Sequence, residues 1–315
     1  MALTGPSLSG IAQAQPQSSP RAQPETIQAK YGKAGPWEVS TREGAGCCDA
    51  AGQKFDVWYP KDLAGNGTPR PVITWGDGAN AVPQQYDYLL THLASWGFVV
   101  VAAHNRNTGS GQELLDGARF ARTQNAKPSS IFYKRLDTDN VGAMGHSLGA
   151  VGAINAAAKS NGLIKSAIPI EPPGQIGCGP KQAGALCSEP DKITDVSMLY
   201  INGTKSSMPP ANQAKPVREI GIASLRAYFD MTPHSVNKAM ATAVGLKHND
   251  IQGQPSCTPD NFECVVGVKP YLGLLTAWNM GVLAGNARAL SAFTSNTGEF
   301  YSYKDWANQA SNITN

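Results

Sequence analysis

Residues 145–149 read Gly-His-Ser-Leu-Gly, so a serine lies between two glycines. The apolar run Val141–Met144 precedes this pattern and an alanine-rich stretch follows it, which predicts a sharp turn from a strand into a helix. The glycines leave room for the strained backbone of such a turn, and the helix N-terminus favours developing negative charge. We therefore predict that Ser147 is a nucleophile; the alternative is a glycine-rich turn without reactivity.

Five histidines could supply the base that a serine hydroxyl needs. His248 follows a late predicted strand and lies downstream of Ser147, the chain order expected for a nucleophile on this kind of turn. We predict His248 as the base, with His234 as the second candidate. His146 adjoins the nucleophile and is expected to line the substrate pocket. The other two, His92 and His104, lie on a predicted helix and at the end of an early strand.

The acid that would orient this base is predicted from the end of a strand. The loop after the predicted strand Ser197–Ile201 contains Lys205 and no carboxylate. The preceding apolar strand, Ser166–Ile170, ends at Glu171, where a charge is costly unless it is paired. We therefore predict Glu171 as the acid. The alternative is a solvent-exposed Glu171, with the acid among Asp191, Asp195 and Asp250.

Two backbone N–H groups should stabilise the oxyanion of an acyl-transfer reaction. One belongs to Leu148, the residue after the nucleophile. The other is predicted from the glycine-rich loop after an early strand, with Asp77 as the first candidate for the donor and Gly78 as the second. Gly78 is also predicted to bind substrate. This chemistry needs no metal and no organic cofactor.

The elements that must position these residues alternate between apolar β-branched runs and helical patterns, which predicts an α/β fold with a mainly parallel twisted sheet. The predicted strands are Phe55–Tyr59, Pro71–Thr74, Phe98–Ala103, Val141–Met144, Ser166–Ile170, Ser197–Ile201 and Ala239–Leu246. The predicted helices lie over 86–93, from Ser147 to about Gly162, over 217–229 and over 271–278. We expect helices on both faces, one domain and no large lid.

Composition excludes several classes of protein. The 26 basic and 23 acidic residues form no basic cluster, which argues against a nucleic-acid partner. No apolar run is long enough to span a membrane. We expect a monomer that acts on an ester substrate.

The cysteines and the first residues indicate export. Six cysteines without a CxxC pair favour disulfides over zinc, and we predict Cys178–Cys187 and Cys257–Cys264. Cys47 and Cys48 are expected to bridge each other or to stay partly reduced. Ala12-Gln13-Ala14 fits a signal-peptidase site, so residues 1–30 are predicted to be a signal-peptide remnant and disordered leader, and 31–315 the catalytic domain of a secreted protein.

These motifs resemble the α/β-hydrolase superfamily, and within it the secreted cutinase and PET hydrolase group with its dienelactone-hydrolase-like relatives. The matching landmarks are residues 71–78, 93–101 and 139–149, then His248 and a C-terminal helix around Trp278. The resemblance implies a lidless serine esterase that forms an acyl-serine intermediate, with Ser147 as nucleophile, His248 as base, and Leu148 and Asp77 as oxyanion donors.

Two departures keep other interpretations open. Lys205 lies near the place of this group's catalytic aspartate, and a glutamate after the earlier strand resembles the carbohydrate esterases of the glucuronoyl type. Pro172-Pro173 replaces an aromatic-bearing loop of polyester hydrolases. The alternatives are therefore a carbohydrate or small-molecule carboxylesterase with a Ser-Glu-His triad, or a non-catalytic binding protein on the same fold.

Overall fold

The computed structural model describes residues 1–2, 5, 25–63, 67–176, 178, 187–207 and 221–314. The predicted signal-peptidase site at residues 12–14 lies outside these residues. Within them, no helix is long and apolar enough to cross a bilayer.

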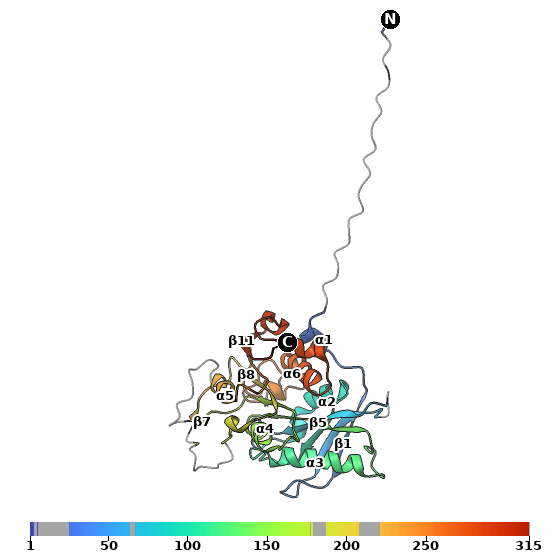
Figure 1. The fold of residues 1–315 in the computed structure, drawn as a ribbon, viewed down its shortest axis with the longest axis vertical. Coiled ribbons are helices and arrows are strands. Elements are labelled where there is room, and N and C mark those ends of the chain that lie inside the picture. Colours follow the sequence, from blue (N-terminus) through green and yellow to red (C-terminus); the bar gives the residue numbers. More distant parts are fainter. Residues whose placement is uncertain are drawn as a thin grey trace.

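A nine-stranded sheet organises the fold, in the order β1-β2-β4-β3-β5-β6-β8-β10-β11 (Figure 1). The strands are β1 (Val39–Gly46), β2 (Phe55–Pro60), β3 (Arg70–Gly76), β4 (Val99–Ala103), β5 (Leu136–His146), β6 (Ser166–Ile170), β8 (Ser197–Gly203), β10 (Lys238–Ala243) and β11 (Trp306–Ser311). The strands from β4 to β10 pair in parallel, whereas β1, β2 and β11 pair antiparallel at the two edges. A separate ribbon joins β7 (Gln175–Ile176) and β9 (Gly221–Ile222).

Helices cover both faces of the sheet because the strands are apolar on both sides. One face carries α1 (Ile27–Gly32), α2 (Asp87–Ser95), α6 (Lys269–Val282) and α7 (Ala287–Ser291). The other carries α3 (Gln112–Ala126), α4 (Leu148–Lys159) and α5 (Leu225–Met231). Short 3-10 turns lie at Pro83–Tyr86, Pro190–Lys192, Asp250–Gln252 and Glu299–Ser302. Two buried apolar clusters, one on each face, form the core.

The α/β architecture and all seven predicted strands are confirmed; Ser166–Ile170 has the predicted ends, and the other strands differ in one or both ends. The last predicted strand, 239–246, is too long, because β10 stops at Ala243 and Gly245 takes a φ of 84° in the following turn. The helices predicted over 86–93, after Ser147 and over 271–278 correspond to α2, α4 and α6. The sequence did not indicate β1, β11 or α3.

Two predictions about chain ends and helices are corrected. The helix predicted over 217–229 is wrong in its described first part, since 221–222 form β9 and α5 begins at Leu225 after the Ser224 cap. Residues 217–220 lie outside the described residues. The expected disordered leader is too long, because α1 begins at Ile27, whose side chain is buried. Figure 1 shows α1 against α6.

Three disulfides are present in the described chain. Cys178–Cys187 and Cys257–Cys264 confirm the predicted pairs, and Cys47 is bonded to its neighbour Cys48.

Candidate active site

Ser147 lies on the turn between β5 and α4, with φ 54° and ψ −112°. Glycines flank this strained residue because side chains would not fit. A Cβ on Gly145 would lie 2.2 Å from the carbonyl oxygen of Gly149, and a Cβ on Gly149 would lie 2.0 Å from that of Gly76. The turn therefore presents the serine at the carboxyl edge of the sheet, as the sequence predicted.

His248 reaches this serine from the loop after β10. Its Nε2 lies 2.9 Å from Oγ of Ser147, which is hydrogen-bonding distance. On the other side of the ring, Nδ1 lies 3.7 Å from Oε2 of Glu171. Neither of these two atoms has a hydrogen-bond partner within the described residues. The separation exceeds a hydrogen bond, but catalytic contacts of unliganded sites are often long and shorten on substrate binding.

Glu171 follows β6 directly and is fully buried, with a φ of 55°. Its N–H donates to the carbonyl oxygen of Ile201 on β8, and its Oε1 accepts a hydrogen bond of 3.2 Å from the Tyr271 hydroxyl on α6. Burial raises the pKa of Glu171, while the nearby side chains of His248 and Ser206 lower it. A carboxylate in this place can orient a neighbouring imidazole and stabilise its charged form.

The other carboxylates considered from the sequence differ in their surroundings. Asp250 is fully buried but accepts backbone hydrogen bonds from Val265, Val266 and Gly267, at 2.6–2.8 Å. Asp191 and Asp195 are solvent-exposed. Within the described residues, neither the Asp191 side chain nor the Asp195 side chain forms a hydrogen bond with His248. Glu171 is therefore the carboxylate that the fold brings to the imidazole.

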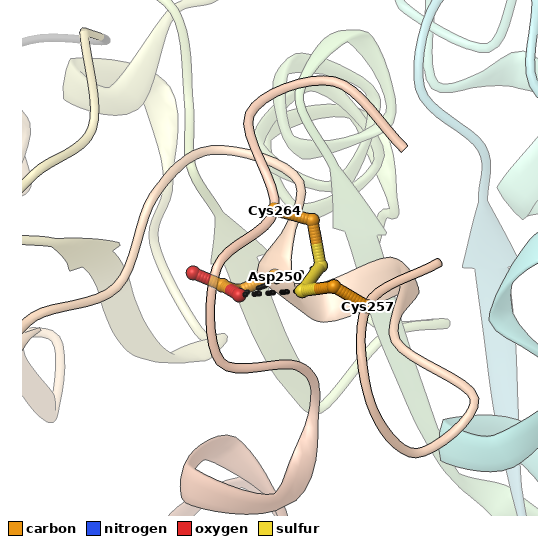
Figure 2. Close-up of side chains that lie close together, drawn as sticks. All are labelled: Asp250, Cys257 and Cys264. Atoms are coloured by element: carbon orange, nitrogen blue, oxygen red, sulfur yellow. Dashed lines mark hydrogen bonds between the residues drawn. A yellow bond between two sulfur atoms is a disulfide. The ribbon is translucent and has the colours of Figure 1, made fainter. Parts of the chain in front are cut away.

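Asp250 also lies beside a disulfide, and the three side chains resemble a metal cluster in their spacing. Figure 2 shows Asp250 facing the sulfur atoms of Cys257 and Cys264. These sulfurs are bonded to each other and offer no thiolate, and the nearer carboxylate oxygen already accepts three N–H groups. The cluster is a structural anchor for the loop 253–267.

Three other histidines, His92, His104 and His234, make no contact with Ser147 in the described structure. His92 is buried with Nε2 on the carbonyl of Tyr31, and burial lowers its pKa to about 4. His104 pairs with Asp56 at 3.2 Å. His234, the second candidate for the base, is exposed.

The predicted oxyanion donors belong to segments that pack on the serine turn. Leu148 is the first residue of α4, and first-turn N–H groups of a helix have no carbonyl partner within it. The backbone carbonyl oxygen of Asp77 accepts a hydrogen bond from the Thr108 hydroxyl, and the Asp77 side chain is fully buried. Gly78 lines the cleft, but its N–H donates to the Tyr86 hydroxyl. The N–H of Gly78, the second candidate for the oxyanion donor, is thus already hydrogen-bonded within the protein.

The chain matches the family model for PETase, described as PET hydrolase-like, over residues 12–176, just over half of its length. The chain belongs to the PET hydrolase-like family. Its mainly parallel sheet with helices on both faces is the α/β-hydrolase fold. This PET hydrolase-like chain is also 31% identical over 121 residues to the bis(hydroxyethyl) terephthalate hydrolase of Streptomyces coelicolor. The aligned part covers 37% of this chain and 36% of that protein.

The cleft of this PET hydrolase-like protein is an open hollow of about 600 Å³ that contains Ser147 and His248. Its lining is rich in amide side chains: Asn80, Gln85, Asn249, Gln252, Gln254 and Asn261. The wall includes the disulfide-closed loop, on which Phe262 is 81% exposed. Sequence reasoning missed this wall, because the turn residues around the cysteines carry no periodic pattern.

His146 lines the same cleft but is only 1% exposed. Its Nδ1 lies 2.9 Å from the Tyr86 hydroxyl and its Nε2 lies 2.9 Å from the carbonyl oxygen of His248. Burial, and next the nearby His248, lowers the pKa of His146 well below its ordinary value. Both ring nitrogens are engaged with protein, although the sequence predicted a substrate contact.

Proposed function

We propose that this protein is a serine hydrolase of carboxylic esters. The observation that carries the proposal is the 2.9 Å contact between Ser147 Oγ and His248 Nε2 on a turn between a strand and a helix. Glu171, buried behind the imidazole, supplies the third group of the triad. The family membership supports the same reaction class.

In the proposed mechanism His248 removes the Ser147 proton as the oxygen attacks the ester carbonyl. Glu171 orients the ring and stabilises its positive charge. The N–H groups of Leu148 and Asp77 stabilise the oxyanion, and the alcohol leaves with the proton from His248. Water, activated by the same base, then releases the acid from the acyl-serine.

For the substrate, we propose small soluble esters, including aromatic diesters. The relative from S. coelicolor is named for a terephthalate diester with hydroxyethyl arms. An open cleft with amide side chains and one exposed phenylalanine suits an apolar ring that carries hydroxyl-bearing arms. The amide lining also favours a second candidate, the ester of a carbohydrate.

We further propose one secreted, monomeric catalytic domain. The three disulfides of the described chain support an oxidising compartment. Mass spectrometry of the protein from its native source would test both export and processing of the first residues.

The decisive experiment is Ser147→Ala on a short-chain nitrophenyl ester, with an expected loss of about 10⁴-fold or more. Fluorophosphonate should label the wild type and not the variant. Retained turnover would overturn the proposal, and no labelling of the wild type would favour a binding protein.

Glu171→Gln should lower kcat by about 10²-fold or more while the protein stays folded, because an amide cannot stabilise the imidazolium. Asp191→Asn is the matched control, since it makes the same change at an exposed carboxylate. Equal rates for the two variants would move the acid elsewhere. Comparing bis(hydroxyethyl) terephthalate, a uronate ester and a polyester film would rank the substrates.

A further inference from the structure

The hydroxyl of Tyr86 connects three segments of the site. Tyr86 is fully buried at the start of α2. Its oxygen lies 3.0 Å from the N–H of Gly78, 2.9 Å from Nδ1 of His146 and 3.1 Å from Nε2 of Gln252. These partners belong to the loop after β3, the serine turn and the loop that carries His248.

The direction of each hydrogen bond follows from the donors available. The backbone N–H of Gly78 and the amide nitrogen Nε2 of Gln252 can only donate, so the Tyr86 oxygen accepts from both. Its single proton is then donated to Nδ1 of His146. That ring must carry its own proton on Nε2, from which it donates to the carbonyl oxygen of His248. One chain of hydrogen bonds thus runs from Gly78 to the backbone of His248.

Burial keeps this chain uncharged. The pKa of the Tyr86 hydroxyl is raised by burial, and the pKa of His146 is lowered by burial and by the nearby His248. The ring centroids of His146 and His248 are 4.7 Å apart, so a second positive ring would oppose the charged His248. A neutral His146 can hold the base without competing for the proton.

We propose that Tyr86 and His146 are positioning residues. They hold three parts of the site in one arrangement: the loop after β3 with Asp77 and Gly78, which we call the oxyanion loop, the nucleophile and the base. The proposal rests on the proposed function, since it concerns the same triad. Tyr86 and His146 act through the backbone of Gly78 and His248. The structure gives neither residue a free polar group for the substrate within its described part.

Tyr86→Phe tests this role by removing one oxygen. We expect kcat on a nitrophenyl ester to fall about 30-fold, equivalent to about 2 kcal/mol, with KM changed less than threefold. Tyr200→Phe is the matched control. Tyr200 is equally buried, and its hydroxyl bonds Thr232 away from the cleft, so this variant should lose similar stability and keep its kcat. Equal kcat values for the two variants would overturn the proposal.

A second pair of variants separates positioning from packing. In His146→Gln the amide oxygen can accept a hydrogen bond from Tyr86, and the amide nitrogen can donate one to the carbonyl oxygen of His248. We therefore expect the kcat of His146→Gln to lie much closer to that of the wild type than the kcat of His146→Leu. Equal losses in the two variants would contradict the proposal.

If these variants do not fold, nitrogen NMR of the wild type remains decisive. It should show His146 neutral and protonated on Nε2 between about pH 5 and 8, and a charged ring or the other tautomer would contradict the network. Failure of the proposed function would be distinct, since Ser147→Ala would then remain active.

Discussion

Two fully buried aspartates lie in the loops beside the nucleophile and have opposite surroundings. Asp250 lies in the loop that carries His248. One of its carboxylate oxygens accepts hydrogen bonds from the N–H groups of Val265, Val266 and Gly267, and the other accepts one from the N–H of Lys247. Asp77, in the oxyanion loop, accepts one hydrogen bond, from the Trp75 indole. Its second oxygen has no partner within the described residues.

The difference shows how donors decide the state of a buried carboxyl. Four backbone donors compensate a charge for the loss of water, whereas one donor does not. Burial accordingly raises the pKa of Asp77 well above its ordinary value. We infer that Asp250 anchors its loop through these hydrogen bonds and that Asp77 holds its proton to a higher pH than an ordinary aspartate, which lowers the negative charge beside the proposed oxyanion site.

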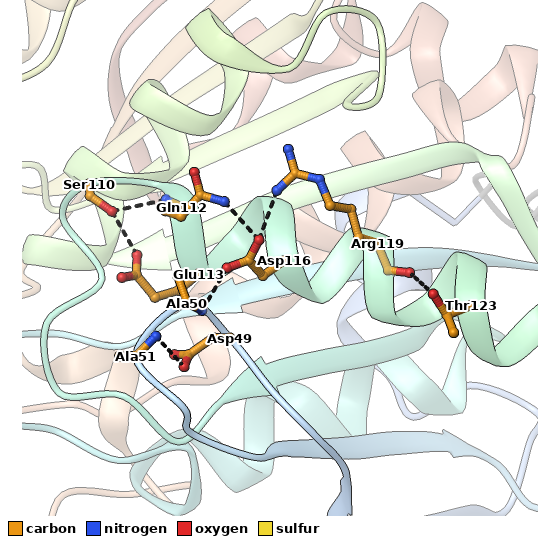
Figure 3. A network of polar contacts seen from close by, with 9 residues as sticks. All are labelled: Asp49, Ala50, Ala51, Ser110, Gln112, Glu113, Asp116, Arg119 and Thr123. Atoms are coloured by element: carbon orange, nitrogen blue, oxygen red, sulfur yellow. Dashed lines mark hydrogen bonds and ion pairs between the residues drawn. The ribbon is translucent and has the colours of Figure 1, made fainter.

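A third aspartate provides a reference away from the cleft. Asp49 follows the bonded pair Cys47–Cys48 and accepts from the backbone of Ala51 and Gln53. Figure 3 shows this turn beside α3, where Asp116 accepts from the N–H of Ala50. Like Asp250, Asp49 anchors a disulfide-bearing turn, but it does not line the cleft.

The largest expected effect is that of Asp250→Ala. It leaves four backbone N–H groups, that of Gly267 buried, without their acceptor, so the free energy of unfolding should fall by about 3 kcal/mol or more. The loop of His248 should loosen, and kcat should fall about tenfold or more. Urea unfolding and ester kinetics measure the two quantities. Asp49→Ala is the control, and we expect its free energy of unfolding to fall by about 1–2 kcal/mol with an unchanged kcat. Equal losses of kcat in the two variants would show that Asp250 has no special role in holding the loop of His248.

An intermediate effect is expected when Cys257 and Cys264 are both replaced by serine. The short loop that they close contributes about 2.5 kcal/mol through the unfolded chain. Asn249 also bonds the backbone of Phe262 and Glu263, so a looser loop should raise KM several-fold. Replacing Cys47 and Cys48 opens no loop beyond adjacent residues and should leave KM unchanged. An unchanged KM in the first variant would show that the wall does not contact substrate.

An effect of the opposite sign is expected of Asp77→Asn. The folded state holds the Asp77 proton to a higher pH than the unfolded chain, so the wild type loses stability as pH rises above about 4. The variant lacks this loss. It should gain stability relative to the wild type by at most about 1.4 kcal/mol per pH unit above that point. Unfolding at pH 4, 6 and 8 measures the gain, and a difference that is constant with pH would show that Asp77 is ionised.

Local patterns in the sequence predicted the central strands and the serine turn, since continuous apolar runs and paired glycines are local signals. The position of Glu171 beside His248 was accessible to the same reasoning, because a charge at the end of an apolar strand requires a partner. The edge strand β11 was missed because its sequence, Trp-Ala-Asn-Gln-Ala-Ser, has few β-formers, and it is held by pairing to β10.

The contacts of Tyr86 could not be predicted, because they join residues far apart in the chain. Gln252 lies 166 residues beyond Tyr86, and His146 lies 60 beyond it. Each partner has an ordinary local context, and only the packed fold brings them to one hydroxyl. The helix over 217–229 failed for a related reason, since pairing with β7 draws 221–222 into a strand.

Because the proposed acid, Glu171, follows β6, the loop after β8 need not supply the carboxylate of the triad. Gly203 must stay small, since a Cβ there would lie 2.2 Å from the carbonyl oxygen of Leu246. Thr204 and Lys205, by contrast, are solvent-exposed, and Oγ1 of Thr204 accepts a hydrogen bond of 2.8 Å from the N–H of Gly245. An engineer could therefore change the surface charge at Lys205 without altering the three side chains of the proposed triad.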